Sequence, residues 1–115
     1  MGAYRVAVRG GDRARAGLAL HLAAAVTGEA PEAVASGRRG TPACKARWLA
    51  LYLAHVGHGW TLDRVAHAFG VTRGTATAAC RWAEDARDAG RFDDAVDRLE
   101  VLMRAAFDGP ELEMA

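Results

Sequence analysis

The chain has 115 residues, the size of one domain, which excludes two catalytic domains and any large α/β enzyme fold. Hydrophobic residues make up 51% and charged residues 25%, the balance of a packed globular protein rather than a disordered one. The net charge of +1 conceals a segregation: residues 36–82 hold seven Arg and Lys against one acid, and residues 83–115 hold four Arg against ten acids. A basic middle attracts phosphate, whereas an acidic end repels it.

The sequence also predicts where the protein resides. No apolar run approaches the roughly 18 residues of a membrane span, and the N-terminus lacks the basic-then-apolar pattern of a signal peptide. Cys44 and Cys80 form no CxxC pair, so we expect free, buried thiols in a reducing compartment. These features favour a cytoplasmic protein, associated with the nucleoid if it binds DNA, and no membrane partner.

The chain begins with a predicted arm and a first helix. Residues 1–11 alternate in polarity but are short and end in Gly-Gly, which predicts a flexible arm. Asp12 is suited to cap a helix that reaches about Val26. We expect the buried stripe of this helix at Leu18, Leu22 and Val26, because these residues recur at a spacing of four.

A short helix, a loop and a long helix are expected next. Pro31 fits the first position of a helix through Ser36, because that position needs no backbone N–H. The Gly and Pro content of residues 36–42 predicts a loop. A long helix should follow from about Pro42 to Val56, with Leu49, Leu53 and Val56 buried and Gly57 and Gly59 ending it.

Two helices separated by a glycine are predicted in the following segment. Thr61 is the candidate N-cap of a helix from Leu62 to Phe69, and Gly70 is its stop. Thr72 is expected to cap a second helix that begins at Arg73, reaches about Ala89 and is broken by Gly90. The residues of the first helix expected to face inward are Leu62, Val65, Ala66 and Phe69.

The last helix is predicted from Phe92 to Phe107, with residues 109–115 as a tail. Its apolar positions at helical spacing are Phe92, Val96, Leu99, Met103 and Phe107. No long strand is expected, so the predicted fold is all-α, with one domain over residues 12–108.

The segment Thr61–Trp82 (TLDRVAHAFGVTRGTATAACRW) has the parts of a helix-turn-helix: a short amphipathic helix, a Gly-containing turn and a second helix. The second helix begins with small, hydroxylated and basic residues, namely Thr72, Arg73, Gly74, Thr75 and Thr77. Small residues let a helix enter the major groove, and Thr and Arg side chains contact base edges or phosphates. The pattern is also compatible with any helical hairpin that has a Gly turn.

A basic loop, Gly37-Arg38-Arg39-Gly40, precedes the long helix and adds to the hypothesis. Such an arm can place an arginine in the minor groove beside a major-groove site. The residues expected at a DNA surface are Arg38, Arg39, Lys45, Arg47, Thr61, Arg64, Thr72, Arg73, Gly74, Thr75, Thr77 and Arg81. Among them Lys45, Arg47, Arg64 and Arg81 are expected to balance phosphates.

From about His21 to Phe107 the chain resembles the C-terminal DNA-binding domain (domain IV) of the bacterial replication initiator DnaA, a Trp-repressor-like helical fold. The segments that carry the resemblance are SGRRG (36–40), KARWLALYLA (45–54), TLDRVAHAFG (61–70) and ACRW (79–82). The resemblance implies binding of double-stranded DNA, with Arg39 in the minor groove and Lys45 and Arg47 at the backbone.

One departure from that family bears on specificity. Its members carry Gly-Arg-Asp-His-Thr-Thr across the turn, whereas residues 70–75 read Gly-Val-Thr-Arg-Gly-Thr, in a turn one residue shorter. We therefore expect a target other than the initiator's own site. The chain has no GxxxxGK[ST] loop, so it lacks the ATPase of an initiator. It is also similar in architecture to the DNA-binding part of activators of gene transfer agents, which implies transcription activation with a partner protein.

We therefore expect a sequence-specific DNA-binding transcription regulator, with no enzymatic activity, metal or cofactor. His55 and His58 have a ligand-like spacing, but Gly57 interrupts their helix. The acidic C-terminal helix is either a solvated face or a docking surface for a transcription partner, RNA polymerase or a second copy in a homodimer. The alternative function is a protein-interaction adaptor, or a replication-initiation regulator, that kept the DnaA-like fold.

Overall fold

The computed structural model describes residues 10–108, and within them it contains six helices and no strand. The helices are α1 (Gly10–Thr27), α2 (Pro31–Ser36), α3 (Pro42–Gly57), α4 (Leu62–Phe69), α5 (Arg73–Ala86) and α6 (Gly90–Ala106). The all-α prediction is confirmed for this part of the chain. None of these helices is both long and apolar enough to cross a membrane.

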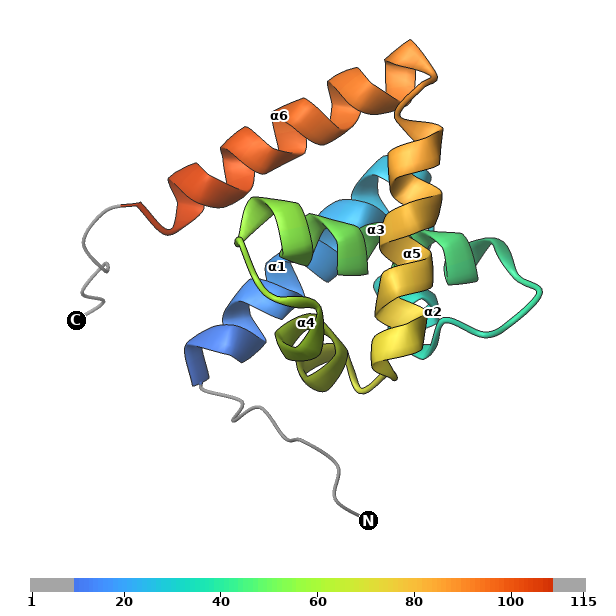
Figure 1. Cartoon of the computed structure of the whole chain (residues 1–115), viewed down its shortest axis with the longest axis horizontal. Coiled ribbons are helices and arrows are strands. Elements are labelled where there is room, and N and C mark those ends of the chain that lie inside the picture. Colours follow the sequence, from blue (N-terminus) through green and yellow to red (C-terminus); the bar gives the residue numbers. More distant parts are fainter. Residues whose placement is uncertain (1–9, 109–115) are drawn as a thin grey trace.

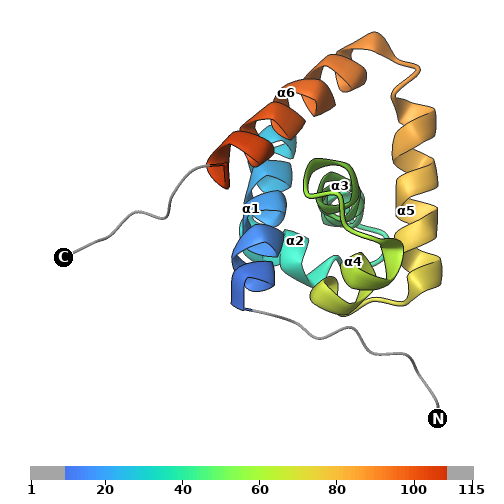
Figure 2. The ribbon, with the colours of Figure 1, turned by 60° about the vertical axis from the view of Figure 1, so that its left-hand side comes forward.

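The helix α3 is the centre of the fold and packs against all five other helices. Figure 2 shows it nearly end-on, with α1, α4, α5 and α6 around it. Six consecutive residues of α3 are buried, from Leu49 to Ala54. A helix that is apolar on every side is stable only when other helices cover it, which explains its central position.

The helix α1 packs against α3 through alanines. Ala16, Ala19 and Ala23 belong to the main core, whereas Leu18 and Leu22 are half-buried at its edge. The predicted leucine–valine stripe is therefore wrong at Val26, which is 51% exposed, and only partly buried at the two leucines. Small side chains allow two helices to approach closely, and here they form the buried face in place of the larger ones.

The start of α1 also differs from the prediction. The helix begins at Gly10, so Asp12 lies inside its first turn instead of preceding the helix, and residues 10 and 11 do not belong to an arm. The remainder of the predicted arm, and the tail over 109–115, lie outside the described residues. Asp12 is 3% exposed and contacts α4, a partner that local sequence patterns do not reveal.

The pair α4 and α5 matches the predicted boundaries at three of four ends. Gly70 follows α4 with a φ of 68°, in the left-handed region that glycine adopts without strain. The hydroxyl oxygens of Thr61 and Thr72 accept hydrogen bonds from the backbone N–H groups of Arg64 and Thr75. Both predicted N-caps are therefore confirmed, and a short turn at residues 70–72 joins the two helices (Figure 1).

The corner between α5 and α6 is where the helix prediction fails. The helix α5 ends at Ala86 rather than near Ala89, and Gly90 begins α6 instead of interrupting the chain. Val96, Leu99 and Met103 of α6 are buried as expected, while Phe107 is 36% exposed. The early end of α5 lets Arg87 turn toward the first turns of α6, where it meets three carboxylates.

Candidate nucleic-acid interface

The basic loop at residues 37–40 lies beside the N-terminal part of α5 (Figure 1). A cavity of about 180 Å³ separates the two, lined by Gly37, Arg39, Cys44, Arg47, Trp48, Leu51, Val71 and Thr75. Arg39 and Thr75 thus border the same space although they are far apart in the sequence. The fold brings the basic loop and the start of α5 to one side of the molecule.

The outer face of α5 carries small and basic side chains near its beginning. Ala76, Ala79 and Ala83 face the core, which leaves Arg73, Gly74, Ala78 and Arg81 exposed. Gly74 and Ala78 extend little from the helix axis, so a flat or grooved partner can come close to the backbone there. The character of the helix changes at Glu84 and Asp85, which are exposed acids.

The threonines of this region organise the start of α5. Thr72 accepts from the Thr75 N–H at 3.1 Å, and its hydroxyl also donates to the Thr75 hydroxyl. Thr77 donates to the Arg73 carbonyl at 2.9 Å. Each hydroxyl therefore has a role within the helix, while an oxygen lone pair remains for a further donor.

Four predicted cationic positions are exposed and form no ion pair within residues 10–108: Arg38, Arg39, Lys45 and Arg81. The Lys45 ammonium lies 4.2 Å from the ring centre of Trp48 and 5.1 Å from that of Trp82. These cation–π contacts hold the ammonium near the junction of α3 and α5 without neutralising it.

Arg73 pairs with Asp63, the single acid between residues 36 and 82. The Arg73 Nε to Asp63 Oδ1 distance is 3.6 Å, and the two side chains are 66% and 41% exposed. An exposed ion pair of this length contributes little to stability, so the Arg73 guanidinium can exchange Asp63 for another anion at little cost.

Arg64 has a structural partner that the sequence did not predict. Its Nη2 and Nε donate to the two carboxylate oxygens of Asp12 at 2.6 and 3.1 Å, and its guanidinium stacks on Trp60. The hydrogen bonds to Asp12 raise the pKa of Arg64, so the side chain stays charged. This bidentate pair ties α4 to α1 and leaves Arg64 a less available phosphate contact than expected.

Arg47 is likewise engaged with the protein. Its side chain is half-buried, and its Nη2 donates to the Phe69 carbonyl at the end of α4, at 2.8 Å. The signal that could have indicated this role is its position on α3 one turn before Leu51, a core residue.

Arg87 organises the opposite end of α5. It forms ion pairs with Asp93, Asp97 and Glu100 of α6 and donates to the Tyr52 hydroxyl at 3.1 Å. The Tyr52 hydroxyl donates to Glu84 Oε1 at 2.8 Å. Burial raises the pKa of Tyr52 to about 12. The acidic helix is therefore largely neutralised on this face, and the exposed acids that remain at the corner are Asp85, Asp88 and Asp94.

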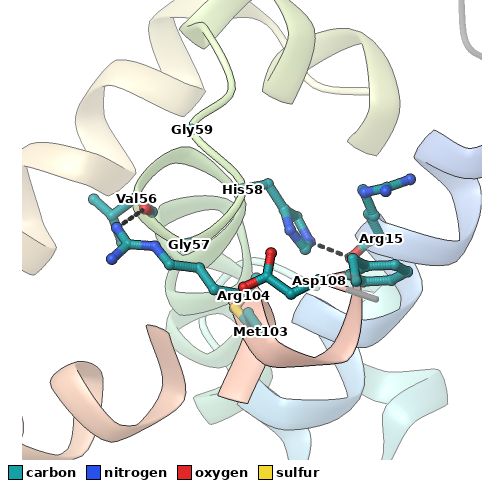
Figure 3. A pocket seen from close by; sticks show the side chains of 9 residues that line it. Arg15, Val56, Gly57, His58, Gly59, Met103, Arg104 and Asp108 are labelled. Atoms are coloured by element: carbon teal, nitrogen blue, oxygen red, sulfur yellow. Dashed lines mark hydrogen bonds between the residues drawn. The ribbon is translucent and has the colours of Figure 1, made fainter. Parts of the chain in front are cut away.

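A second cavity, of about 360 Å³, lies between the start of α1 and the ends of α3 and α6 (Figure 3). Two of its polar side chains have partners: His58 Nε2 donates to the Arg15 carbonyl at 2.8 Å, and Arg104 donates to the Val56 carbonyl. Burial lowers the pKa of His58, so the ring is neutral near pH 7. None of the residues predicted to contact DNA lines this cavity.

The histidines and cysteines do not converge. His55 Nδ1 lies 2.7 Å from the Trp60 carbonyl, while His58 faces α1, so the two rings serve different contacts. Within residues 10–108 no three metal-ligating side chains form a group. Burial raises the pKa of Cys80 to about 11, which disfavours the reactive thiolate.

Comparison of the chain with protein-family models, curated proteins and solved structures finds no match. The resemblance to DnaA domain IV therefore rests on the four short segments at 36–40, 45–54, 61–70 and 79–82 alone.

Proposed function

We propose that this chain is a sequence-specific, double-stranded DNA-binding transcription regulator in which α4 and α5 act as a helix-turn-helix of the DnaA domain IV type. The observation that carries the proposal is the convergence of the basic loop with the N-terminal part of α5 around one cavity. The three segments that border this cavity carry exposed cations: Arg38 and Arg39 on the loop, Lys45 on α3, and Arg73 and Arg81 on α5. A surface of this kind suits the closely spaced phosphates of a duplex.

In the proposed complex the first turns of α5 enter the major groove. Gly74 and Ala78 allow close approach, and Arg73 and Thr77 reach base edges. Arg39 enters the adjacent minor groove, as the resemblance implies, because a narrow minor groove attracts arginine. Lys45 and Arg81 balance phosphates, while Arg64 stabilises α4 through Asp12.

The target is expected to differ from the initiator's own site, because the turn lacks the family's acidic and histidine base readers. The exposed acids at the α5–α6 corner are repelled by DNA and stay available to a transcription partner or RNA polymerase. This separation of a basic DNA-binding side from an acidic corner fits an activator of phage-like or gene transfer agent genes that acts with such a partner.

The test begins with selection of duplexes from a random pool, followed by titration of the selected site. Arg39→Ala should weaken binding about 5-fold, or ~1 kcal/mol, as for one lost specific contact. Arg73→Ala should relax the selected motif. The matched control is Arg98→Ala, an exposed arginine on α6, which should leave affinity unchanged. A pool that yields no shared motif, or an Arg39→Ala variant of full affinity, would overturn the proposal.

A second candidate function is a protein-interaction adaptor, which one observation favours. Val101 and Leu102, two neighbouring apolar residues on α6, are 65% and 56% exposed, and contiguous exposed apolar side chains can mark a protein contact. Salt dependence separates the two functions, because DNA binding through several phosphates falls steeply with salt and an apolar protein contact does not.

A further inference from the structure

Arg47 connects α3 to the end of α4. The last four carbonyls of a helix have no partner within it, and Phe69 is the last residue of α4. The Phe69 carbonyl accepts a hydrogen bond from Arg47 Nη2 at 2.8 Å. A cation at the negative end of a helix is favourable, so Arg47 stabilises the segment that leads into the turn before α5.

The same side chain touches the start of the basic loop. Gly37 has a φ of 55° and its N–H donates to the Ala33 carbonyl, which ends α2. A Cβ atom at position 37 would lie 2.2 Å from Arg47 Cδ, which is too close for two non-bonded carbon atoms. The backbone of the loop therefore lies directly against the aliphatic part of Arg47.

The burial of Arg47 argues against a phosphate contact. Its Nε is buried and, within the described residues, has no hydrogen-bond partner. A guanidinium that binds the DNA backbone keeps its head in water when the DNA is absent. Arg47 instead directs its polar end into the protein, between the loop that holds Arg39 and the turn that precedes Thr75.

We propose that Arg47 is a positioning residue that fixes the basic loop relative to α5, so that Arg39 and Arg73 reach the two grooves of one duplex together. This inference rests on the proposed function. It departs from the role implied by the family resemblance, in which Arg47 contacts the backbone. A loop that is already ordered before DNA binds loses less conformational entropy on binding, and this smaller loss increases the affinity.

The decisive variants are Arg47→Met and Lys45→Met, two cations on the same turn of α3 with opposite surroundings. Methionine keeps an unbranched stem of similar length and removes the charge. We expect Lys45→Met to reduce the slope of log affinity against log salt by about 0.9, the value for one lost phosphate contact. Arg47→Met should weaken binding about 5-fold and leave that slope unchanged.

A double-mutant cycle tests the coupling itself. If Arg47 positions Arg39, then Arg39→Ala should cost much less in the Arg47→Met background than in the wild type. Urea unfolding of each variant establishes that the measurements are made on folded protein. Additive effects of the two substitutions would overturn the positioning role.

Two loop glycines give an independent test. Gly37 and Gly40 both have positive φ, so alanine strains the backbone at either position, but a Cβ on Gly40 meets no atom within 4 Å. Gly37→Ala should reproduce the binding loss of Arg47→Met, because it displaces the Arg47 stem. Gly40→Ala should lose less affinity. Equal losses would contradict the proposal.

A measurement without DNA separates this inference from the proposed function. Nuclear magnetic relaxation of the amide nitrogens of residues 38–41 should show greater motion in Arg47→Met than in the wild type or Lys45→Met. Unchanged relaxation together with a reduced salt slope would make Arg47 a phosphate contact. If the wild type binds no duplex, the proposed function fails, and the relaxation data alone decide whether Arg47 fixes the loop.

Discussion

The two ends of α5 use arginine in opposite ways. At the N-terminal end, Arg73 is 66% exposed and has one distant carboxylate, Asp63. At the C-terminal end, Arg87 is 20% exposed and meets three carboxylates and a phenol. Both arginines carry the same charge, so the comparison shows that pairing, rather than charge count, decides which cations remain for an external anion.

The difference follows from how acids are spaced along the chain. Asp93, Asp97 and Glu100 fall on one face of α6 at intervals of four and three, and that face turns back toward Arg87. The basic segment has a single acid and cannot form such a cluster. The carboxylates of α6 supply the anionic partners at the C-terminal end of α5, and in the proposed complex the phosphates of the duplex supply them at the N-terminal end.

The largest expected effect comes from breaking the C-terminal cluster. Arg87→Ala leaves three carboxylates close together without their cation and should lower the free energy of unfolding by about 2 kcal/mol, less than for a fully buried pair. Urea denaturation measures this. Arg91→Ala, an exposed arginine at the start of α6, should change stability by under about 0.5 kcal/mol. A loss of DNA affinity by folded Arg87→Ala would contradict the division between the two ends.

At the N-terminal end the expected effect on stability is smaller. Thr72→Ala removes the cap of α5 and should cost about 1 kcal/mol, with the Thr75 N–H left without its acceptor. The control is Thr77→Ala, whose hydroxyl bonds a carbonyl of its own helix and whose loss is offset by the helix preference of alanine. Thermal unfolding distinguishes the two, and equal melting temperatures would argue that Thr72 contributes no cap.

A pH titration examines the phenol in the C-terminal cluster. Burial raises the pKa of Tyr52 to about 12 from an ordinary value of 10, so the folded state keeps its proton where the unfolded state has lost it. This contribution to stability is present below pH 10 and is lost as the pH rises toward 12. Tyr52→Phe should flatten that decline in urea titrations. The pKa of Cys80 is also raised, to about 11, so this thiol contributes to the decline in an overlapping pH range. Cys80→Ala measures that contribution separately.

The smallest expected effect tests the free end. Asp63→Asn removes the carboxylate that pairs with Arg73 and should change stability by under about 0.5 kcal/mol. Affinity for non-specific duplex should rise about 2-fold, because one repulsive carboxylate is removed near the phosphates. Asp94→Asn, on α6, should have less effect, since charges beyond about 8 Å are screened at physiological salt. Equal gains for both variants would show that only net charge matters.

Local signals predicted the helices α2 and α4 and the caps Thr61 and Thr72, because a cap, a proline or a glycine acts on neighbouring residues. The engagement of Arg64 and Arg47 was missed because their partners lie 52 and 22 positions away. The end of α5 was missed for a similar reason: Gly90 predicts a break at its own position, whereas α5 ends at Ala86 and the partners of the following Arg87 lie on α6. Whether the exposed cations contact DNA stays a prediction.

The ion pair between Asp12 and Arg64 also limits which fragments of this domain can retain its fold. A fragment that begins at Pro42 keeps α3, α4 and α5 but leaves the Arg64 guanidinium without its carboxylate and α3 without its alanine-lined neighbour. Grafting α4 and α5 alone onto another scaffold would also remove the donor to the Phe69 carbonyl. The segment Thr61–Trp82 is therefore not a transferable cassette, and recombination that preserves it has to carry the chain from α1 onward.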